Sequence, residues 1–210
     1  MSIMTFFFQH SVLVPIHGIV QLTSNGSRSL FLLKYVRHKW MVFFSIGAIL
    51  GAWSAYYLVS SIDEFYPKLL IALLIFYVLF KPKKLPELKI PLWSYSIVGF
   101  FSANLGVLIG ATGPFLAAFF IRDDIEKEEL VATKAAMQVF VHLIKIPVFI
   151  GLGFQYSDHL IIIIVMSVAA IIGTKMGVGY LKRINKKLFN YAFKSILFLA
   201  ALRILYKLFI

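Results

Sequence analysis

The chain of 210 residues is 60% hydrophobic and only 14% charged, and its mean hydropathy is +0.88. Soluble globular domains are nearer to half apolar and a quarter charged, so this composition excludes them and indicates an all-α polytopic membrane protein. The absence of cysteine excludes disulfides and thiolate sites, and the net charge of +12 is more simply explained by basic cytoplasmic loops than by nucleic-acid binding.

Seven to eight helical segments are predicted, separated by short charged or proline-containing breaks. In the first half they cover residues 2–14, which is short, then 15–35, 40–60 and 66–80. In the second half they cover residues 91–121, 125–150, 159–181 and 187–209. We therefore expect a first membrane repeat over residues 1–80, a basic cytoplasmic linker over 81–90 and a second repeat over 91–210.

Small residues indicate that the two halves are copies of each other. Gly47, Gly51 and Ala55 have the same spacing as Ala169, Gly173 and Gly177 in the corresponding segment of the second half. Small residues four apart allow two helices to approach closely in lipid. The spacing is common in membrane helices, so this match alone is weak.

Polar residues provide a second match between the halves. The two sets are His17, Gln21, Asn25 and Arg28, and Lys134, Gln138, His142 and Lys145. Each set has the spacing i, i+4, i+8 and i+11, which places its four side chains on one helical face. Two independent matches favour an internal duplication over chance.

The basic connections predict how the copies are oriented. They lie between the second and third, fourth and fifth, and seventh and eighth segments, around Arg37, Lys83 and Lys182. All three fall on one side of the membrane if the segment over 91–121 enters and returns without a net crossing. That side is then cytoplasmic, because Lys and Arg favour it. Equivalent connections of the two halves then lie on opposite sides, which makes the halves inverted repeats, an arrangement typical of secondary transporters.

Away from their ends, the predicted spans contain cations but no carboxylate. These cations include Arg28, Lys134, Lys145 and Lys175, together with the titratable side chains His17 and His142. Each charged side chain at the bilayer centre costs at least about 2.5 kcal/mol, so an anionic substrate is the simplest partner. The alternative for a single lysine is that it lies near a surface or extends its side chain towards one.

The segment over 91–121 is interrupted at Gly110-Ala111-Thr112-Gly113-Pro114, which predicts a broken re-entrant helix near residues 110–114. Pro114 suits the first position of a new helix, and Thr112 can cap it. The N-terminus of that helix would present free N–H groups to an anion. A kink that binds no ligand is the alternative interpretation.

Catalytic and metal sites are not predicted. A nucleophile–base–acid set would need a carboxylate inside the spans, and none is present, so we do not expect an enzyme or a cofactor. His17 and His142 could form a metal pair, but no carboxylate or thiolate completes the ligand set. These histidines are the groups in the spans that titrate near neutral pH, so any proton coupling is expected to use them.

At these residues the sequence resembles the sulfite exporter TauE/SafE family, also called the toluene sulfonate uptake permease family. The resembling stretches are Pro15 to Arg28, Gly47 to Ala52, Gly110 to Pro114, Val131 to Ala136 and His142 to Lys145. The resemblance covers almost the whole chain from Pro15 onward. It implies eight helices in two inverted repeats, transport of small sulfur-containing anions, and the inner membrane of a bacterium.

The first fourteen residues depart from that resemblance. Family members usually open with a glycine-rich broken helix, which is the first-half counterpart of Gly110 to Pro114. No such glycines precede Pro15 here, which implies that this element is truncated or degenerate.

The resulting hypothesis is a secondary transporter of small sulfur-containing oxyanions such as sulfite or organosulfonates, with export as the favoured direction. The predicted substrate-binding residues are His17, Gln21, Asn25, Arg28, Gly110, Thr112, Gly113, Lys134, Gln138, His142 and Lys145. The expected partners are the anion, the lipid bilayer and protons as a coupling ion. A passive anion channel and a non-transporting membrane subunit are the alternatives.

Overall fold

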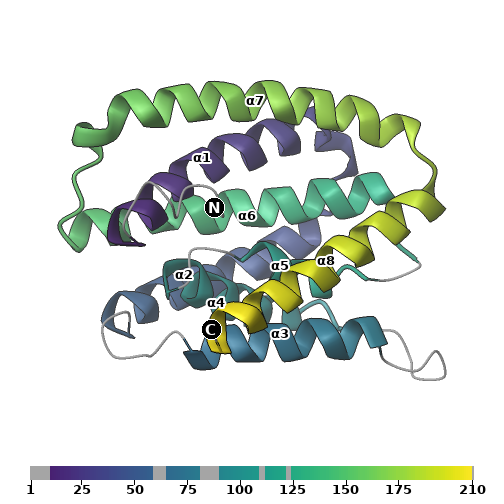
Figure 1. The fold of residues 1–210 in the computed structure, drawn as a ribbon, viewed down its shortest axis with the longest axis horizontal. Helices are drawn as coiled ribbons and strands as arrows, with labels where there is room; N and C mark the ends of the chain where they lie inside the picture. The colour runs from purple at the N-terminus through teal and green to yellow at the C-terminus, as the bar shows by residue number, and fades with distance from the viewer. Residues whose placement is uncertain (1–9, 59–64, 81–89, 109–111, 122–123, 210) are drawn as a thin grey trace.

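The computed structural model describes residues 10–58, 65–80, 90–108, 112–121 and 124–209, which contain helices and no strand (Figure 1). The helices are α1 (His10–Phe31), η2 (Leu33–Tyr35), α2 (His38–Leu58), α3 (Phe65–Phe80), α4 (Ser94–Leu108), α5 (Gly113–Ala118), α6 (Lys127–Gly151), η3 (Tyr156–His159), α7 (Leu160–Arg183) and α8 (Lys186–Phe209). The predicted all-α class is confirmed.

Four helical stretches of the described chain are long and apolar enough to cross a membrane: α2, α6, η3 with α7, and α8. Helices α3 and α4 are apolar but shorter. Helix α1 has 22 residues and carries the polar face predicted for it.

One predicted boundary in the first half is wrong. Residues 10–14 do not end a separate first helix, because α1 continues from His10 through Pro15 to Phe31. Residues 2–9 of that predicted helix lie outside the described residues. A proline inside a membrane helix is tolerated where neighbouring protein surrounds it, and residues 13–18 of α1 are buried. The helix also ends earlier than the predicted residue 35, at η2.

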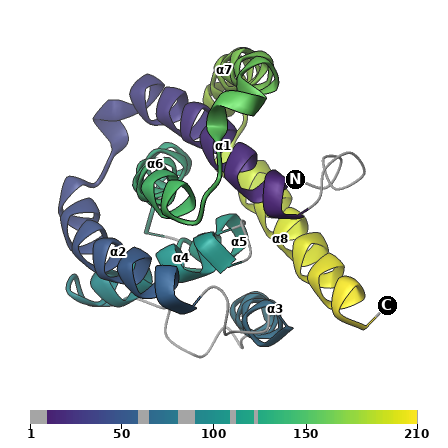
Figure 2. The same ribbon diagram turned by 90° about the vertical axis from the view of Figure 1, so that its left-hand side faces the viewer.

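Helix α6 lies at the centre of the molecule, inside an arc formed by α1, α2 and α4 (Figure 2). Helices α1 and α6 run antiparallel, since the rings of His17 and His142 are 6.4 Å apart and a Cβ on Gly26 would lie 4.0 Å from Val139 Cγ2. We call this contact the α1–α6 seam; it includes both predicted polar faces.

The packing pairs support the inverted repeats. Helix α1 packs on α6 and α7, α6 packs on α1 and α2, and α3 packs on α8. Exchanging α1 with α6, α2 with α7 and α3 with α8 reproduces these pairs. The exchange maps the pairs α1–α6 and α3–α8 onto themselves, and the two helices of each pair are antiparallel. The two-fold axis that relates the two halves must therefore be perpendicular to the helices. In a membrane, that axis defines an inverted repeat.

The glycines of α2 and α4 join these two helices tightly. A Cβ on Gly47 or Gly51 would overlap the backbone carbonyl of Ser96 or Phe100, and one on Gly99 would overlap that of Phe44. The matching stripe on α7 is not used in this way. A Cβ on Gly173 or Gly177 would meet nothing within 4 Å among the described residues.

Polar contacts gather several connections at one end of the molecule. Arg37, after α1, bonds to Glu129 at the start of α6 at 2.8 Å. Lys186, at the start of α8, bonds to Glu126 at 2.9 Å, and Lys127 donates to the Leu181 carbonyl of α7 at 2.8 Å. The basic connections after α1 and after α7 therefore lie together, as predicted, while residues 81–89 are outside the described chain.

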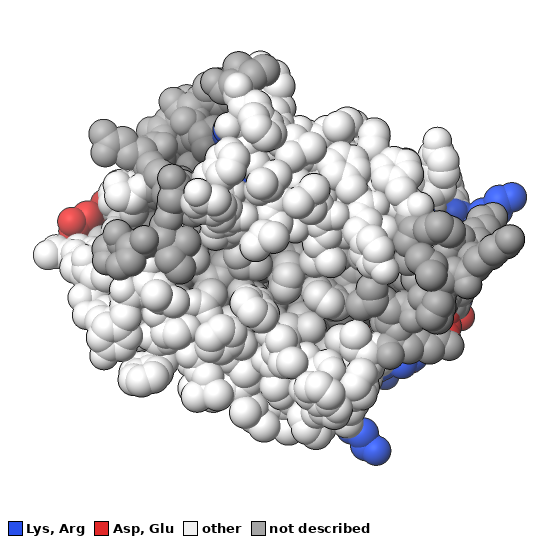
Figure 3. All heavy atoms as spheres, turned by 90° about the horizontal axis from the view of Figure 1, so that it is seen from below, with Lys and Arg blue, Asp and Glu red and all other residues white. Residues whose placement is uncertain are grey.

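Much of the surface between the ends is apolar. On the face shown in Figure 3, almost all Lys, Arg, Asp and Glu atoms lie at the two ends, and a broad band between them lacks charge. Large apolar side chains are exposed on the outer helices, for example Ile161 (82%) on α7 and Tyr191 (74%) on α8. Such a band is expected to face lipid acyl chains.

Candidate functional site

The predicted break in the segment over 91–121 is present. Helix α4 ends at Leu108, and α5 restarts at Gly113 with Pro114 in its first turn. Gly110 and Ala111 lie outside the described residues.

The predicted capping role of Thr112 is wrong. Thr112 has a near-helical backbone (φ −95°, ψ −8°), whereas a capping side chain requires an extended one, and it makes no capping hydrogen bond. Helix α5 has only six residues, so it carries little of the dipole that attracts anions. The anion-binding role predicted for this terminus stays a prediction.

Side chains of α6 face this break. A Cβ on Gly106 of α4 would lie 3.3 Å from Thr112 Cγ2 and 3.5 Å from Lys145 Cδ, so these two side chains flank the same glycine. Gly113 lies beside Gln138, because a Cβ there would be 3.6 Å from the Gln138 Nε2 atom. The break and the polar face of α6 therefore form one cluster.

The cluster holds several buried polar atoms without a hydrogen-bond partner among the described residues. They are Thr112 Oγ1, both ring nitrogens of His142, and Lys145 Nζ. His142 and Lys145 are each 1% exposed. The aromatic ring of Phe149 lies 5.9 Å from Lys145 Nζ, which gives at most a weak cation–π contact. Buried polar groups normally have partners, so this set favours a ligand site.

The polar face of α1 is, by contrast, hydrogen-bonded to itself. Arg28 Nη1 donates to Asn25 Oδ1 at 3.2 Å, and Asn25 Nδ2 donates to Gln21 Oε1 at 3.2 Å. Gln21 Nε2 lies 3.2 Å from His17 Nε2. The two faces that matched in sequence therefore differ, and the unsatisfied one is on α6.

The predicted cations do not surround one point. Lys134 and Lys145 are eleven residues apart on α6, which corresponds to about 16 Å along the helix. Lys134 lies instead near Arg28, close enough for an electrostatic interaction. His17, Thr112, His142 and Lys145 thus share one end of the seam, Gln21, Gln138 and the neighbouring Gly113 lie midway, and Asn25, Arg28 and Lys134 share the other end.

Lys175, predicted as an intramembrane cation, is not buried. Its side chain is exposed on α7, as are those of Lys194 and Arg203 on α8. The alternative that such a side chain extends along the lipid-facing surface towards the membrane boundary is therefore favoured for Lys175.

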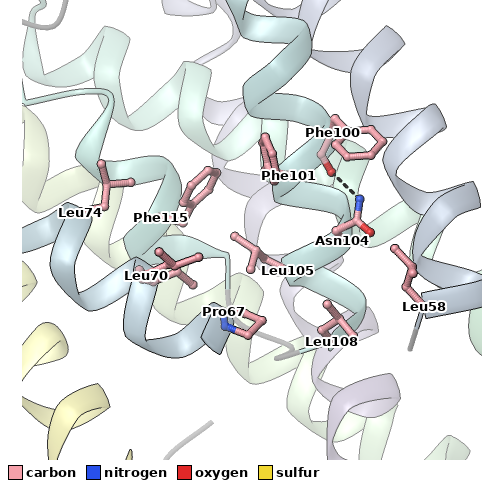
Figure 4. Close-up of a pocket in the computed structure, with 11 residues that line it drawn as sticks. Leu58, Pro67, Leu70, Leu74, Phe100, Phe101, Asn104, Leu105, Leu108 and Phe115 are labelled. Atoms are coloured by element: carbon pink, nitrogen blue, oxygen red, sulfur yellow. Dashed lines mark hydrogen bonds between the residues drawn. The ribbon is translucent and has the colours of Figure 1, made fainter. Parts of the chain in front are cut away.

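The described chain also contains a cavity of about 320 Å³ among α2, α3, α4 and α5 (Figure 4). Its walls are leucine, isoleucine, phenylalanine and proline side chains, with Asn104 as the polar one. The Asn104 amide group is paired with the Ser54 hydroxyl at 3.0 Å and donates to the Phe100 carbonyl at 3.0 Å. With no charge in its walls, this cavity is not suited to a small anion.

Two buried polar residues of α4 were missed in the sequence. Ser102 is fully buried and its hydroxyl has no partner among the described residues, and Asn104 fixes α4 to α2 through Ser54. Their signal was the presence of polar side chains within an otherwise apolar stretch.

Comparison with protein families gives a match over nearly the whole chain. The family model described as "Sulfite exporter TauE/SafE" matches residues 1–204. The chain belongs to the TauE/SafE family. No curated protein and no solved structure matches it. Membership makes this TauE/SafE protein a multi-pass membrane protein of a transporter family, which points away from an enzyme.

Proposed function

We propose that this TauE/SafE protein is a secondary transporter that exports small sulfur-containing oxyanions, such as sulfite or organosulfonates, across the inner membrane of a bacterium. The anion binds between α6 and the α4–α5 break. Lys145 supplies the charge, while Thr112 and His142 supply hydrogen bonds.

The observation that carries this proposal is the environment of Lys145. Its ammonium group is buried in a membrane helix, and no carboxylate among the described residues pairs with it. An unpaired cation at that depth costs at least about 2.5 kcal/mol. An oxyanion with several acceptor oxygens would offset that cost and would also bond to the Thr112 hydroxyl.

Proton coupling is part of the proposal. Both ring nitrogens of His142 are free of partners among the described residues, and His17 and Lys145 lie nearby. A proton on His142 would place a second positive charge beside Lys145, which is favourable only when an anion is bound. Anion binding and proton uptake should therefore strengthen each other.

Flux of sulfite and of methanesulfonate into proteoliposomes tests the site. Lys145→Gln should reduce flux at low substrate concentration by about tenfold or more, since a charge-assisted hydrogen bond contributes about 1.5–3 kcal/mol. Lys175→Gln, which removes an exposed lysine of α7, is the matched control and should leave flux unchanged. Equal flux in the Lys145→Gln variant and the wild type would contradict the proposed site.

The same assay separates the alternatives. Accumulation of the anion against its own gradient, driven by a pH difference, is expected of a secondary transporter. Flux that only dissipates the anion gradient would indicate a passive channel. A folded wild-type protein with no flux of either anion would indicate a non-transporting membrane subunit.

A further inference from the structure

The other end of the α1–α6 seam contains a second pair of cations. Arg28 of α1 and Lys134 of α6 are both partly buried, and the antiparallel contact of the two helices places both at the end away from His17 and His142. Lys134 lies about 16 Å along α6 from Lys145. One small oxyanion therefore cannot contact Lys145 and the Arg28–Lys134 pair at the same time. The pair therefore needs an explanation of its own.

The partners of this pair among the described residues are neutral. The guanidinium of Arg28 donates to Asn25 Oδ1 at 3.2 Å and, more weakly, to Ser24 Oγ at 3.5 Å. The nearest carboxylate along α6, Glu129, is bound to Arg37 at 2.8 Å. No described carboxylate bonds to Arg28 or Lys134. Two like charges held together in a membrane helix pair, without a counter-ion, are unfavourable unless an anion joins them.

The chemistry of the pair matches the substrate proposed for Lys145. A guanidinium can donate two parallel hydrogen bonds to two oxygens of one sulfite or sulfonate group, and Arg28 has five N–H donors of which the structure uses two. Lys134 adds a mobile ammonium group. Between the two ends lie Gln21 and Gln138, whose amides can bond to an anion without holding it by charge.

We infer that Arg28 and Lys134 form a second binding site for a small oxyanion, at the basic end of the α1–α6 seam and separate from Lys145. The inference rests on the proposed function for the choice of ligand. In an exporter whose basic end is cytoplasmic, this site receives the anion first, and the Lys145 site receives it second. The exchange that relates α1 to α6 also relates Arg28 to Lys145, so the two sites are counterparts in the two repeats.

The number of anions bound per chain tests the inference. The probe is radiolabelled methanesulfonate, measured by equilibrium dialysis against the full chain in phosphate-free dodecyl maltoside micelles. We expect two bound per wild-type chain, one in the Arg28→Gln/Lys134→Gln variant and one in Lys145→Gln. The Lys182→Gln/Arg183→Gln variant removes two exposed charges from the same end of the molecule and should still bind two.

Each contrary outcome has a distinct meaning. One anion in the wild type, lost in Lys145→Gln, would overturn the second site and leave the proposed function intact. Two anions in Lys145→Gln with one in the Arg28→Gln/Lys134→Gln variant would overturn the proposed substrate site instead. If that double variant does not fold, Arg28→Lys keeps the charge but loses the paired donors. It should weaken one of the two sites about tenfold, and unchanged binding would overturn the inference.

A lipid phosphate has the same chemistry as the proposed ligand, so a second arm distinguishes the two sources. Dialysis is repeated with phosphatidylglycerol added to the micelles. Retention of two methanesulfonates supports a site for soluble anions. Loss of the one that depends on Arg28 would assign the site to a lipid headgroup and overturn the inference.

Discussion

Lys145 and Lys175 occupy membrane helices of the same protein in different environments. Lys145 is enclosed by α6, α4 and the break before α5, whereas the Lys175 side chain is exposed on α7. A lysine on an outer surface can extend its four methylenes along the lipid and place its charge near the membrane boundary. An enclosed lysine cannot, so its charge must be compensated inside the protein.

Removing the Thr112 hydroxyl should weaken substrate binding without removing charge. Thr112→Val keeps the side-chain shape, and a hydrogen bond of about 1 kcal/mol corresponds to roughly a fivefold rise in the KM for sulfite flux. Thr174→Val is the matched control, because the Thr174 hydroxyl is buried but lies 3.1 Å from the Ser24 hydroxyl. It should lower thermal stability and leave KM unchanged. An unchanged KM in Thr112→Val would remove this residue from the site.

His142 should make anion binding depend on pH. Because a proton on His142 adds positive charge beside Lys145, methanesulfonate should bind more tightly as the pH falls. His142→Gln cannot take up that proton, so its affinity should be nearly independent of pH. Isothermal titration between pH 5.5 and 8 checks this, and a retained pH dependence in the variant would assign the proton to another group.

The site could be predicted only in part from the sequence. A spacing of four, four and three residues fixes which side chains of α6 share a face, so it could predict that Gln138, His142 and Lys145 lie on one side of this helix. The spacing does not show which residues of a second helix lie opposite. Because α1 and α6 pack antiparallel, Arg28 and Lys145 lie at opposite ends of the α1–α6 seam. The periodicity within each helix could not predict this, since it does not give the relative direction of the two helices.

At the scale of the elements, the glycine contacts between α2 and α4 should control stability. Gly51→Ala would place a methyl group into the Phe100 carbonyl, and overpacking of this kind costs about 1–3 kcal/mol. Gly177→Ala on α7 meets nothing within 4 Å among the described residues and is the matched control. Thermal unfolding in detergent should show a melting temperature lowered by several degrees for Gly51→Ala only. Equal effects of both substitutions would contradict the tight packing.

Helix positions were predicted well where long apolar runs end at charged or proline-containing breaks. Helices α2, α6, α7 and α8 begin and end within two residues of their predicted bounds, because their lengths are set by the membrane thickness. The start of α1 was wrong, since a proline alone does not reveal whether a helix ends or continues through it. The small-residue faces of α2 and α7 also differed in their contacts. The spacing of small residues shows that another helix can pack closely there, but it does not show that such a helix is present.

At the scale of the whole molecule, the exchange of packing pairs supports two inverted repeats. The predicted bounds of those repeats, residues 1–80 and 91–210, remain a prediction. The connections after α1 and after α7 lie at the same end of the molecule. This fits the predicted orientation, in which the basic end is cytoplasmic.

Cysteine labelling checks this orientation directly, because the chain has no cysteine of its own. Arg183→Cys lies at the end of α7, and Gln155→Cys lies between α6 and η3; both positions are exposed. A membrane-impermeant maleimide added to intact cells should label Gln155→Cys only, and inside-out vesicles should give the reverse result. Labelling of both from the same side would exclude a membrane crossing by α7.

The close packing of α2 against α4 has a mechanical consequence. Because the backbones of α2 and α4 are in direct contact, the two helices have no room to slide past one another. They are therefore expected to move as one rigid body. Thr112 packs beside Gly106 of that body, while Lys145 belongs to α6. Tilting of the rigid body relative to α6 would widen or narrow the gap between the hydroxyl and the ammonium group. The glycines, though they touch no substrate, would thereby confine the opening and closing of the site to a single interface.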